Sequence, residues 1–294
     1  MPRVLVSSRT VILTRPGDRN QALMSRLTGA GLCVIEAPAL RLEPIPCSRE
    51  DLPLPQSVDL VMFVSGHAAD FYLQACRRSH PHWQWPDTVQ AACVGQSTAW
   101  HLVQSGRVPP TQIICPFWSP VASPSDSLAV RRVNKPLTEQ DSEALWHLLE
   151  PMCSHLQRVL IVRGDTGRNW LTEKLQSQGV EVLQLPLYRR VPAQWAPDLQ
   201  FSLSTAFHQP VAPLVVLTSR ESVDAFMHNV LCLTDMSVLE GVLFIAIHPR
   251  IATHLKQQCM ASGMVKPPMV QLSAPDNESL FTAICALSSP VPHS

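Results

Sequence analysis

An internal repeat constrains the fold of this chain more than any other feature of the sequence. Residues 11–45 align without a gap on residues 159–193. Each copy begins with a short apolar strand and a polar turn, and continues with a helix that has leucines four residues apart on one face. A glycine follows the helix, Gly31 or Gly179, where a left-handed residue ends a helix. A second strand comes next, and a strand–helix–strand unit of this length requires parallel strands.

The repeat extends beyond this unit. The matched segments are residues 59–73 with 213–227 and residues 89–102 with 242–255, which align Ser65 with Ser219, Asp70 with Asp224 and His101 with His254. Each segment is an apolar strand, a polar residue at its carboxyl end and then a helix. The sequence therefore predicts two similar doubly wound α/β domains, each built on a parallel sheet.

Length and charge exclude several classes of protein. A chain of 294 residues suits about two domains. Lysine plus arginine and aspartate plus glutamate number 23 each, so the net charge is zero, which argues against a nucleic-acid partner. No apolar run approaches the roughly 20 residues of a membrane helix, and the polar N-terminal segment does not resemble a signal peptide. We expect a cytoplasmic protein with no nucleic-acid or membrane partner.

The cysteines and histidines do not indicate a metal site. The nine cysteines are scattered and contain no C-x-x-C pair, so we interpret them as reduced, buried thiols. His80-Pro81-His82 is interpreted as an ordinary surface loop in preference to a metal site. The sequence also lacks the standard nucleotide, zinc-protease and serine-hydrolase motifs. The turn at residues 164–168 (GDTGR) is by itself weak evidence for a nucleotide.

Two kinds of segment interrupt the repeated units. Residues 116–141 are rich in proline and serine, and we expect a surface loop insertion there. The proline-marked segments 42–57 and 191–213 are candidate crossings between the domains.

Polar residues recur where the predicted strands end and the next helices begin. These turns are Thr14-Arg15, Ser65-Gly66-His67, residues 95–98, Arg163-Gly164, residues 219–221 and His248-Pro249-Arg250. In open parallel sheets this edge binds ligands, and the free N–H groups of each helix start favour anions. For any single turn the alternative is ordinary helix capping. Six such turns together favour a large polyanionic ligand.

The order of these elements resembles the uroporphyrinogen-III synthase family over roughly residues 11–287, without the 116–141 insertion. The matching elements are TRP at 14–16, FVSGHAA at 63–69, VGQSTA at 94–99, DSEAL at 141–145, VLIVRGDTGRNWL at 159–171, LPLYRR at 185–190 and VVLTSRESV at 215–223. The chain departs from the family at residues 248–250, where it has His-Pro-Arg in place of the usual Gly-Pro-Thr. Arg250 is then expected either to contact substrate by its charge or to lie outside the site.

The resemblance implies a two-domain organisation and a reaction. The first domain would comprise residues 1–39 and 191–294 and the second residues 40–190, with a two-stranded linker and an active-site cleft between them. The substrate would be hydroxymethylbilane, a linear tetrapyrrole with eight carboxylates. Loss of its hydroxyl as water and closure through a spiro intermediate, with the last pyrrole inverted, would give uroporphyrinogen III for tetrapyrrole biosynthesis. The resemblance implies no metal and no cofactor, a monomer, and a transient contact with hydroxymethylbilane synthase.

The resemblance also implies roles for individual residues. Tyr188 would donate a proton to the leaving hydroxyl, because a phenol, with an ordinary pKa of about 10, keeps its proton at neutral pH; the alternative is a packed strand aromatic. Tyr72, the other tyrosine, is expected in the core. The residues expected to bind carboxylates are Arg15, Ser65, Gln96, Ser97, Thr98, Arg163, Gly164, Ser219, Arg220 and Arg250. For Arg15 and Arg163 the alternative is structural pairing with a nearby acid such as Asp165.

Two other functions compete with this one. Paired α/β domains with a cleft are also typical of non-enzymatic binding proteins that close about a hinge. A nucleotide-dependent enzyme using the 164–168 turn is the third hypothesis, although the chain lacks a phosphate-binding lysine motif and a pattern of metal-binding carboxylates. Formation of product from hydroxymethylbilane distinguishes the enzyme from the binding protein.

Overall fold

The computed structural model describes residues 9–16, 20–116 and 139–288. The chain divides into two compact units, a first unit of residues 1–41 with 191–294 and a second unit of residues 42–190. The chain therefore starts in the first unit, builds the second and returns. The first crossing, between Arg41 and Leu42, comes slightly later than the predicted boundary after residue 39.

The first unit contains a five-stranded sheet in the order β11-β10-β9-β1-β2, in which all neighbouring strands are parallel. Its strands are β1 (Thr10–Leu13), β2 (Cys33–Glu36), β9 (Leu214–Leu217), β10 (Leu243–Ala246) and β11 (Met269–Leu272). Its helices are α1 (Gln21–Gly29), α7 (Pro197–Phe207), α8 (Arg220–Leu231), α9 (Pro249–Ala261) and α10 (Asn277–Ser288), with the short η5 (Met236–Leu239).

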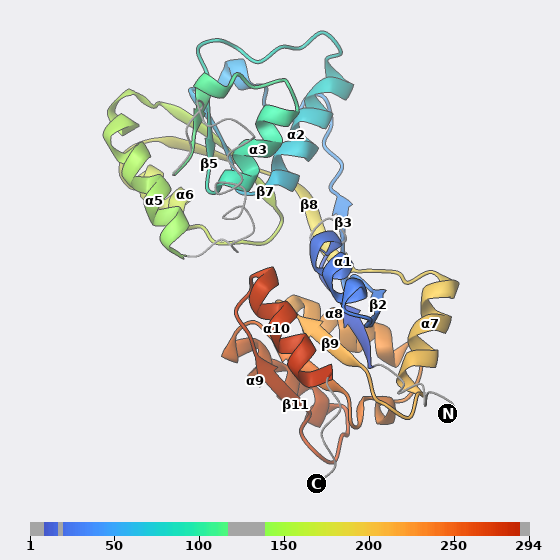
Figure 1. Cartoon of the computed structure of the whole chain (residues 1–294). Coiled ribbons are helices and arrows are strands. Elements are labelled where there is room, and N and C mark those ends of the chain that lie inside the picture. The colour runs from blue at the N-terminus through green and yellow to red at the C-terminus, as the bar shows by residue number, and fades with distance from the viewer. Residues whose placement is uncertain (1–8, 17–19, 117–138, 289–294) are drawn as a thin grey trace. The chain divides into compact units, whose positions relative to one another are not determined.

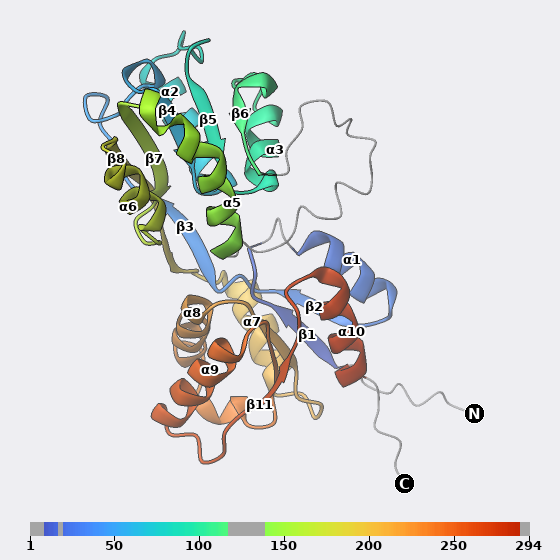
Figure 2. The ribbon, with the colours of Figure 1, turned by 90° about the vertical axis from the view of Figure 1, so that its left-hand side faces the viewer.

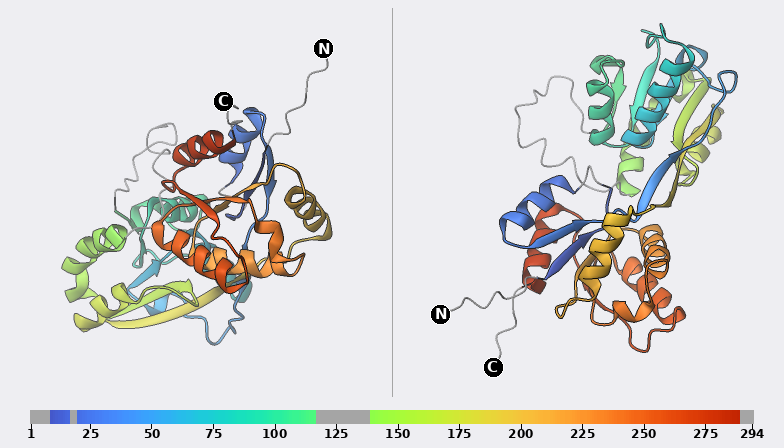
Figure 3. Two further views of the ribbon diagram at one scale, coloured as in Figure 1. Left: turned by 90° about the horizontal axis from the view of Figure 1, so that it is seen from below. Right: turned by 90° about the vertical axis from the view of Figure 1, so that its right-hand side faces the viewer.

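Helices cover both faces of the first unit's sheet (Figures 2 and 3). Helices α1 and α10 pack on one face through Leu27 and Ile284, against strand residues such as Val11. Helices α7, α8 and α9 pack on the other face, where Phe226 and Phe244 lie in the core. Successive strand residues point to opposite faces of a sheet. Since helices cover both faces, every residue of the central strands β1 and β9 is buried.

The second unit contains a six-stranded sheet in the order β3-β8-β7-β4-β5-β6. Its strands are β3 (Leu40–Pro44), β4 (Leu60–Phe63), β5 (Gln90–Cys93), β6 (Ile113–Ile114), β7 (Arg158–Gly164) and β8 (Glu181–Pro192). Its helices are α2 (Gly66–Ser79), α3 (Gln96–Gln104), α5 (Glu139–Leu149) and α6 (Trp170–Ser177), with the short η2 (Pro55–Ser57), η3 (Pro110–Gln112) and η4 (Glu150–His155).

The second unit also has a helix layer on each face of its sheet (Figure 1). Helices α2 and α3 cover one face around Phe63 and Tyr72. Helices α5 and α6 cover the other around Met62 and Leu145. Tyr72 is fully buried and its hydroxyl donates to the Pro53 carbonyl at 2.8 Å, so it is a core residue, as predicted.

Strands β3 and β8 carry the chain across the unit boundaries, and they pair as neighbours. The Ala193 amide donates to the Ala39 carbonyl, while the Ile45 amide donates to the Leu187 carbonyl. As residue numbers rise along β3, those of the bonded residues fall along β8, so the two strands are antiparallel. The prediction of two parallel-sheet α/β units with a two-stranded linker is confirmed.

Each unit combines the strand–helix–strand segment of one sequence repeat with the remaining strands of the other repeat. The first copy of the strand–helix–strand unit forms β1 and β2, and the second copy forms β7 and β8. The first unit adds β9 to β11 beside β1, whereas the second adds β4 to β6 beside β7. Gly31 and Gly179 each adopt φ 82° just after α1 and α6, as the repeat predicted. Both sheets consequently reverse their strand order at one point, β1/β9 or β7/β4.

Residues 117–138 of the predicted insertion lie outside the described residues, and Glu139 begins α5. In the described ranges every helix is too short or too polar to cross a lipid bilayer.

Candidate functional site

Tyr188 lies in β8 beside Gly164, at the carboxyl end of β7. Leu185 and Leu187 of β8 face the core under α2 and α3, so strict alternation would turn Tyr188 to the opposite face. The register of β7 and β8 shifts between Arg163 and Gly164, and Tyr188 joins the same core as the two leucines. An irregularity of this kind re-aims a side chain, and here it directs the phenol toward α2.

The Tyr188 side chain is packed on its ring and hydrogen-bonded at its hydroxyl. Its ring stacks on Phe71 with centroids 5.5 Å apart and planes 19° apart, and meets the edge of His67 at 6.5 Å. Its hydroxyl lies 3.0 Å from the Ser65 hydroxyl, and the residue is 3% exposed. The ring is therefore packed, as expected for the alternative of a packed strand aromatic. Its hydroxyl, however, lies at the N-terminus of α2.

Gly164 has a steric reason to be glycine. A Cβ at this position would lie 2.9 Å from Cε2 and 3.1 Å from Cζ of Tyr188. Such contacts are closer than carbon atoms tolerate, so any side chain at residue 164 would displace the phenol. Gly164 is predicted from the sequence to bind a substrate carboxylate, and the structure gives it in addition a role in seating Tyr188.

Ser65 is the N-cap of α2, which follows β4. Its hydroxyl oxygen accepts a hydrogen bond from the Ala68 amide at 3.1 Å. That bond leaves the Ser65 hydroxyl hydrogen available, so Ser65 can donate to the Tyr188 oxygen or accept from it. The serine thus combines the capping role and a contact with the predicted proton donor.

The predicted residues 96–98 form the first turn of α3, on the same face of the sheet as α2. Gly95 is the N-cap of α3 and offers no side-chain cap, in contrast to Ser65 of α2. Thr98 is buried, while its two predecessors are partly exposed. The His101 ring packs on Gly66, where a Cβ would lie 2.5 Å from Cδ2. Helices α2 and α3 therefore adjoin near their starts.

Arg163 points away from Tyr188, to the sheet face covered by α5 and α6. It is 7% exposed. Its Nη1 donates to Asn169 Oδ1 at 2.6 Å and to Gln184 Oε1 at 3.0 Å, and its Nε donates to the Gly164 carbonyl. Its acceptors are thus neutral oxygens rather than the Asp165 carboxylate considered from the sequence.

Arg15, the repeat partner of Arg163, is held in a similar network. Its Nε donates to Asn20 Oδ1 at 3.2 Å and its Nη2 donates to Asn277 Oδ1 at 3.0 Å. The Asn20 amide donates in turn to Glu36 Oε1 at 2.8 Å. Arg15, which is 9% exposed, thus contacts Asn277 at the start of α10 directly and Glu36 of β2 only through Asn20.

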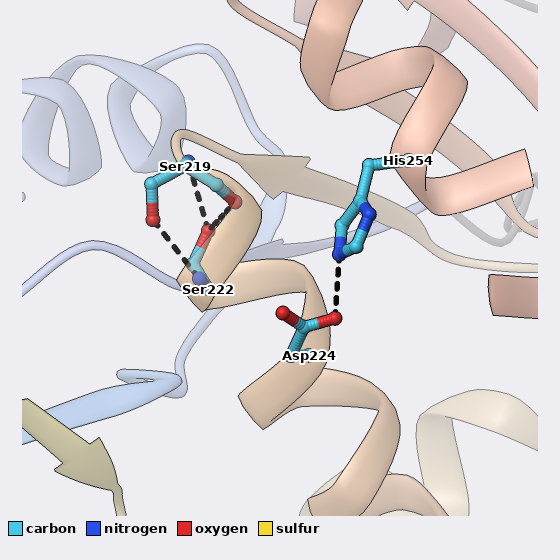
Figure 4. A network of polar contacts seen from close by, with 4 residues as sticks. All are labelled: Ser219, Ser222, Asp224 and His254. Carbon is cyan, nitrogen blue, oxygen red and sulfur yellow. Dashed lines mark hydrogen bonds and ion pairs between the residues drawn. The ribbon is translucent and has the colours of Figure 1, made fainter. Parts of the chain in front are cut away.

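The remaining predicted residues start helices of the first unit. Ser219 caps α8 in a reciprocal capping box with Ser222, whose amide donates to the Ser219 hydroxyl at 2.9 Å (Figure 4). Arg220 and Arg250 are exposed in the first turns of α8 and α9. His248 caps α9, because its Nδ1 accepts from the Arg250 amide at 3.1 Å. The departure from the family pattern at residue 248 therefore has a local structural role.

An aspartate–histidine contact recurs in both units. His254 Nε2 lies 2.6 Å from Asp224 Oδ1 and joins α9 to α8 (Figure 4). His101 Nδ1 lies 3.3 Å from Asp70 Oδ2 and joins α3 to α2. The strand-end turns predicted from the sequence do not include these residues. The signal was present in the repeat alignment, which matches both the aspartates and the histidines.

The nine cysteines are all free thiols. Burial raises the pKa of the Cys76 thiol to about 12 and that of Cys259 to about 11. These thiols stay protonated at neutral pH. The expectation that every cysteine is buried is wrong for Cys33 and Cys232, which are exposed, and for Cys47 and Cys285, which are only partly buried. Cys33 is the first residue of β2 and Cys232 is the C-cap of α8, so both lie at the end of an element, where solvent reaches the side chain.

The described residues include no group of three histidine, cysteine, aspartate or glutamate side chains placed to hold a metal ion. His82 of the His-Pro-His segment is exposed, and His80 is the C-cap of α2.

Comparison with protein families gives a match over most of the chain. The family model described as "Uroporphyrinogen-III synthase HemD" matches residues 21–267. This range includes strands of both sheets and the Tyr188 region.

Individual relatives agree with the family match. A uroporphyrinogen-III synthase from Synechococcus elongatus is 28% identical over 254 residues, which cover 82% of this chain and 83% of the relative. The enzyme of that name from Salmonella typhimurium is 27% identical over 62% of this chain and 65% of its own length. Among solved structures, uroporphyrinogen-III synthetase from Helicobacter pylori aligns with a TM-score of 0.54 over 95% of this chain and 99% of that chain. At 15% identity, the last likeness shows the fold alone.

Proposed function

The chain belongs to the uroporphyrinogen-III synthase family, and from this membership we propose that it converts hydroxymethylbilane to uroporphyrinogen III. The carbon–oxygen bond of the hydroxymethyl group breaks, and the oxygen leaves as water. The substituted carbon of the last pyrrole then attacks the resulting cation and forms a spiro intermediate, whose rearrangement inverts that ring. Ring closure releases one proton, so the net change is the loss of one water molecule.

We propose Tyr188 as the acid that protonates the leaving hydroxyl. The observation that carries this assignment is the 3.0 Å contact between the hydroxyls of Tyr188 and Ser65 at the N-terminus of α2. When Ser65 donates to the phenol oxygen, the phenol hydrogen is directed to the substrate. Proton donation by a positioned side chain contributes about 10²–10⁴-fold to a rate. The proton released on ring closure restores the phenol.

The start of α2 favours this chemistry. As Tyr188 gives up its proton, negative charge develops on the phenol oxygen. The Ser65 hydroxyl can donate to that oxygen, and the positive end of the helix dipole lies beside it. The packing of the ring on Phe71 holds the phenol in one orientation. Positioning of reacting groups is the other large contribution that a protein makes to such a ring closure.

We assign the carboxylates of the substrate to the turns at the carboxyl edges of the two sheets. The proposed residues are Arg15, Ser65, Gln96, Ser97, Thr98, Arg163, Gly164, Ser219, Arg220 and Arg250. The backbone N–H groups in the first turn of a helix, together with the helix dipole, favour a carboxylate. We further propose that the protein acts as a monomer in the cytoplasm and receives its substrate through transient contact with hydroxymethylbilane synthase.

The decisive experiment is an isomer assay. Hydroxymethylbilane is generated enzymatically, the protein is added, and the products are oxidised and resolved as uroporphyrin I and III. Without catalysis the bilane closes to isomer I, so we expect isomer III to dominate only when the protein is present. A product mixture that stays at isomer I would refute the proposal and favour the non-enzymatic binding protein.

A further inference from the structure

A pocket of about 200 Å³ lies at the carboxyl edge of the second unit's sheet. Its floor is formed where β7, β4 and β5 end, at Arg163, Val64 and Val94. Helix α6 contributes Trp170 and Leu171 to its wall. The strand order reverses between β7 and β4, and ligands of open α/β sheets bind at such a reversal. We call this space the Arg163 pocket.

Arg163 presents unused donors to the pocket. Its Nε and Nη1 groups donate to the three neutral oxygens described above. Its Nη2 group has no acceptor in the part of the chain that the structure describes, although a guanidinium carries two N–H donors there. The Nη2 atom lies toward Gly167, where a Cβ would be only 2.9 Å away. Gly167, which also lines the pocket, thus leaves room for Nη2 where a side chain would displace it.

The charge of Arg163 is also uncompensated. Arg163 is only 7% exposed. No carboxylate of the described residues lies within ion-pair distance of its guanidinium. Buried charges are ordinarily paired, because removing a charge from water is costly without a partner. Neutral acceptors at Asn169 and Gln184 orient the guanidinium without cancelling its charge. The pocket is therefore electrostatically suited to an anion.

The first repeat shows how the same framework looks with an acid in place. Residue 36 of the first copy aligns with residue 184 of the second, and these are Glu36 and Gln184. In the first unit the Glu36 carboxylate belongs to the network around Arg15, through Asn20. In the second unit the neutral Gln184 touches Arg163 directly. The second copy thus lacks the internal carboxylate that the first copy has.

From these observations we propose that the Arg163 pocket binds one carboxylate side chain of the substrate, with Gln184 keeping the guanidinium free of an internal counter-ion. The inference rests on the proposed function for the identity of the ligand. Whole drug-sized ligands occupy about 300–1,000 Å³, so this pocket suits a part of a tetrapyrrole, namely an acidic side chain. Trp170 and Leu171 offer an apolar surface to its methylene groups, while Nη2 binds its carboxylate.

The substitution Gln184→Glu tests the pocket with little change of shape. The new carboxylate would lie where Gln184 Oε1 lies, 3.0 Å from Arg163 Nη1, and would neutralise the guanidinium. We expect the KM for hydroxymethylbilane to rise about ten- to hundred-fold, as expected for loss of a charged hydrogen bond, with kcat within about two-fold. The thermal midpoint should not fall. Gln176→Glu, which adds the same charge at an exposed position of α6, is the matched control and should leave KM unchanged.

Arg163→Gln and the double variant Arg163→Gln/Gln184→Glu show whether the effect acts through the arginine. If it does, adding Gln184→Glu to Arg163→Gln should raise KM no further, because the two changes remove one interaction. Arg158→Gln controls for loss of an arginine, since Arg158 is exposed at the opposite end of β7. A KM for Gln184→Glu within two-fold of the parent protein, or independent effects in the double variant, would overturn the proposal.

Calorimetry separates this inference from the proposed function. The probe is uroporphyrin III, a stable octacarboxylate, and we expect its Kd to increase for Gln184→Glu by the same factor as KM. If the parent protein forms no isomer III, the proposed function fails. If the parent forms isomer III but binds uroporphyrin III no more tightly than Gln184→Glu does, the pocket fails and the function stands.

Discussion

Replacing Tyr188 by phenylalanine removes the proposed acid and leaves its surroundings in place. Phenylalanine keeps the ring, so the stacking on Phe71 and the close fit against Gly164 persist. The substitution deletes one hydroxyl and its 3.0 Å contact with Ser65. The structure therefore allows the chemical role of the hydroxyl to be separated from the packing role of the ring.

The expected magnitudes for Tyr188→Phe differ strongly between stability and catalysis. Loss of one hydrogen bond costs about 1 kcal/mol of unfolding free energy. Loss of a general acid lowers kcat by about 10²–10⁴-fold, which corresponds to about 3–5 kcal/mol of activation free energy. The KM for hydroxymethylbilane should change little, since the phenol contacts the leaving hydroxyl and not the carboxylates.

Tyr72→Phe is the matched control for this experiment. Tyr72 is buried in the same unit, and its hydroxyl donates one hydrogen bond to the Pro53 carbonyl. Both variants should lose similar stability in chemical denaturation, while only Tyr188→Phe should lose the rate of isomer III formation. A Tyr188→Phe protein with the parent rate, or a Tyr72→Phe protein slowed as much, would refute the assignment of the acid.

Three further substitutions test individual contacts. Ser65→Ala removes a helix cap and the Tyr188 contact, so we expect a loss of about 1–2 kcal/mol in urea unfolding and a lower kcat; an unchanged kcat would remove Ser65 from the mechanism. Gly164→Ala places a Cβ 2.9 Å from the phenol ring, so we expect a loss of about 1–3 kcal/mol of unfolding free energy. The kcat of the folded variant should also fall, because the phenol is displaced; wild-type turnover would show that the ring adapts. Asp276→Ala removes the carboxylate that accepts from the Ser279 amide at 2.9 Å, and backbone hydrogen bonding holds the pKa of Asp276 below its usual value. The parent should therefore be more stable than the variant above the unfolded-state pKa of about 4, and this difference should shrink as pH falls through the lowered folded-state pKa; a difference independent of pH in thermal melts from pH 2 to 7 would contradict it.

Residue patterns that depend on local geometry were predicted well from the sequence. The leucine spacing of the repeat identified α1 and α6, and the glycines that follow both helices adopt the left-handed conformation expected. Ser65 and Ser219 stand at the ends of β4 and β9 and cap the next helices. These features depend on neighbours within a few residues, so periodicity and capping preference suffice to find them.

The contacts of the candidate site depended on distant parts of the chain. Tyr188 and Ser65 are separated by 123 residues, and the irregularity that turns Tyr188 toward α2 leaves no signature in the alternation of β8. The acceptors of Arg163 likewise come from a helix start and a neighbouring strand, where the sequence suggested the adjacent Asp165.

The sequence by itself determined the α/β class, the parallel strands, the repeated strand-end turns and, through its order of elements, the family. Only the tertiary structure decided that Tyr188 meets Ser65, that Arg163 lies on the other sheet face with donors to spare, and that Gln184 accepts a hydrogen bond from Arg163. The reason is physical. Hydrophobic periodicity is written residue by residue, whereas the direction of a side chain at a strand end depends on register, on irregular pairing and on packing against helices from elsewhere in the chain.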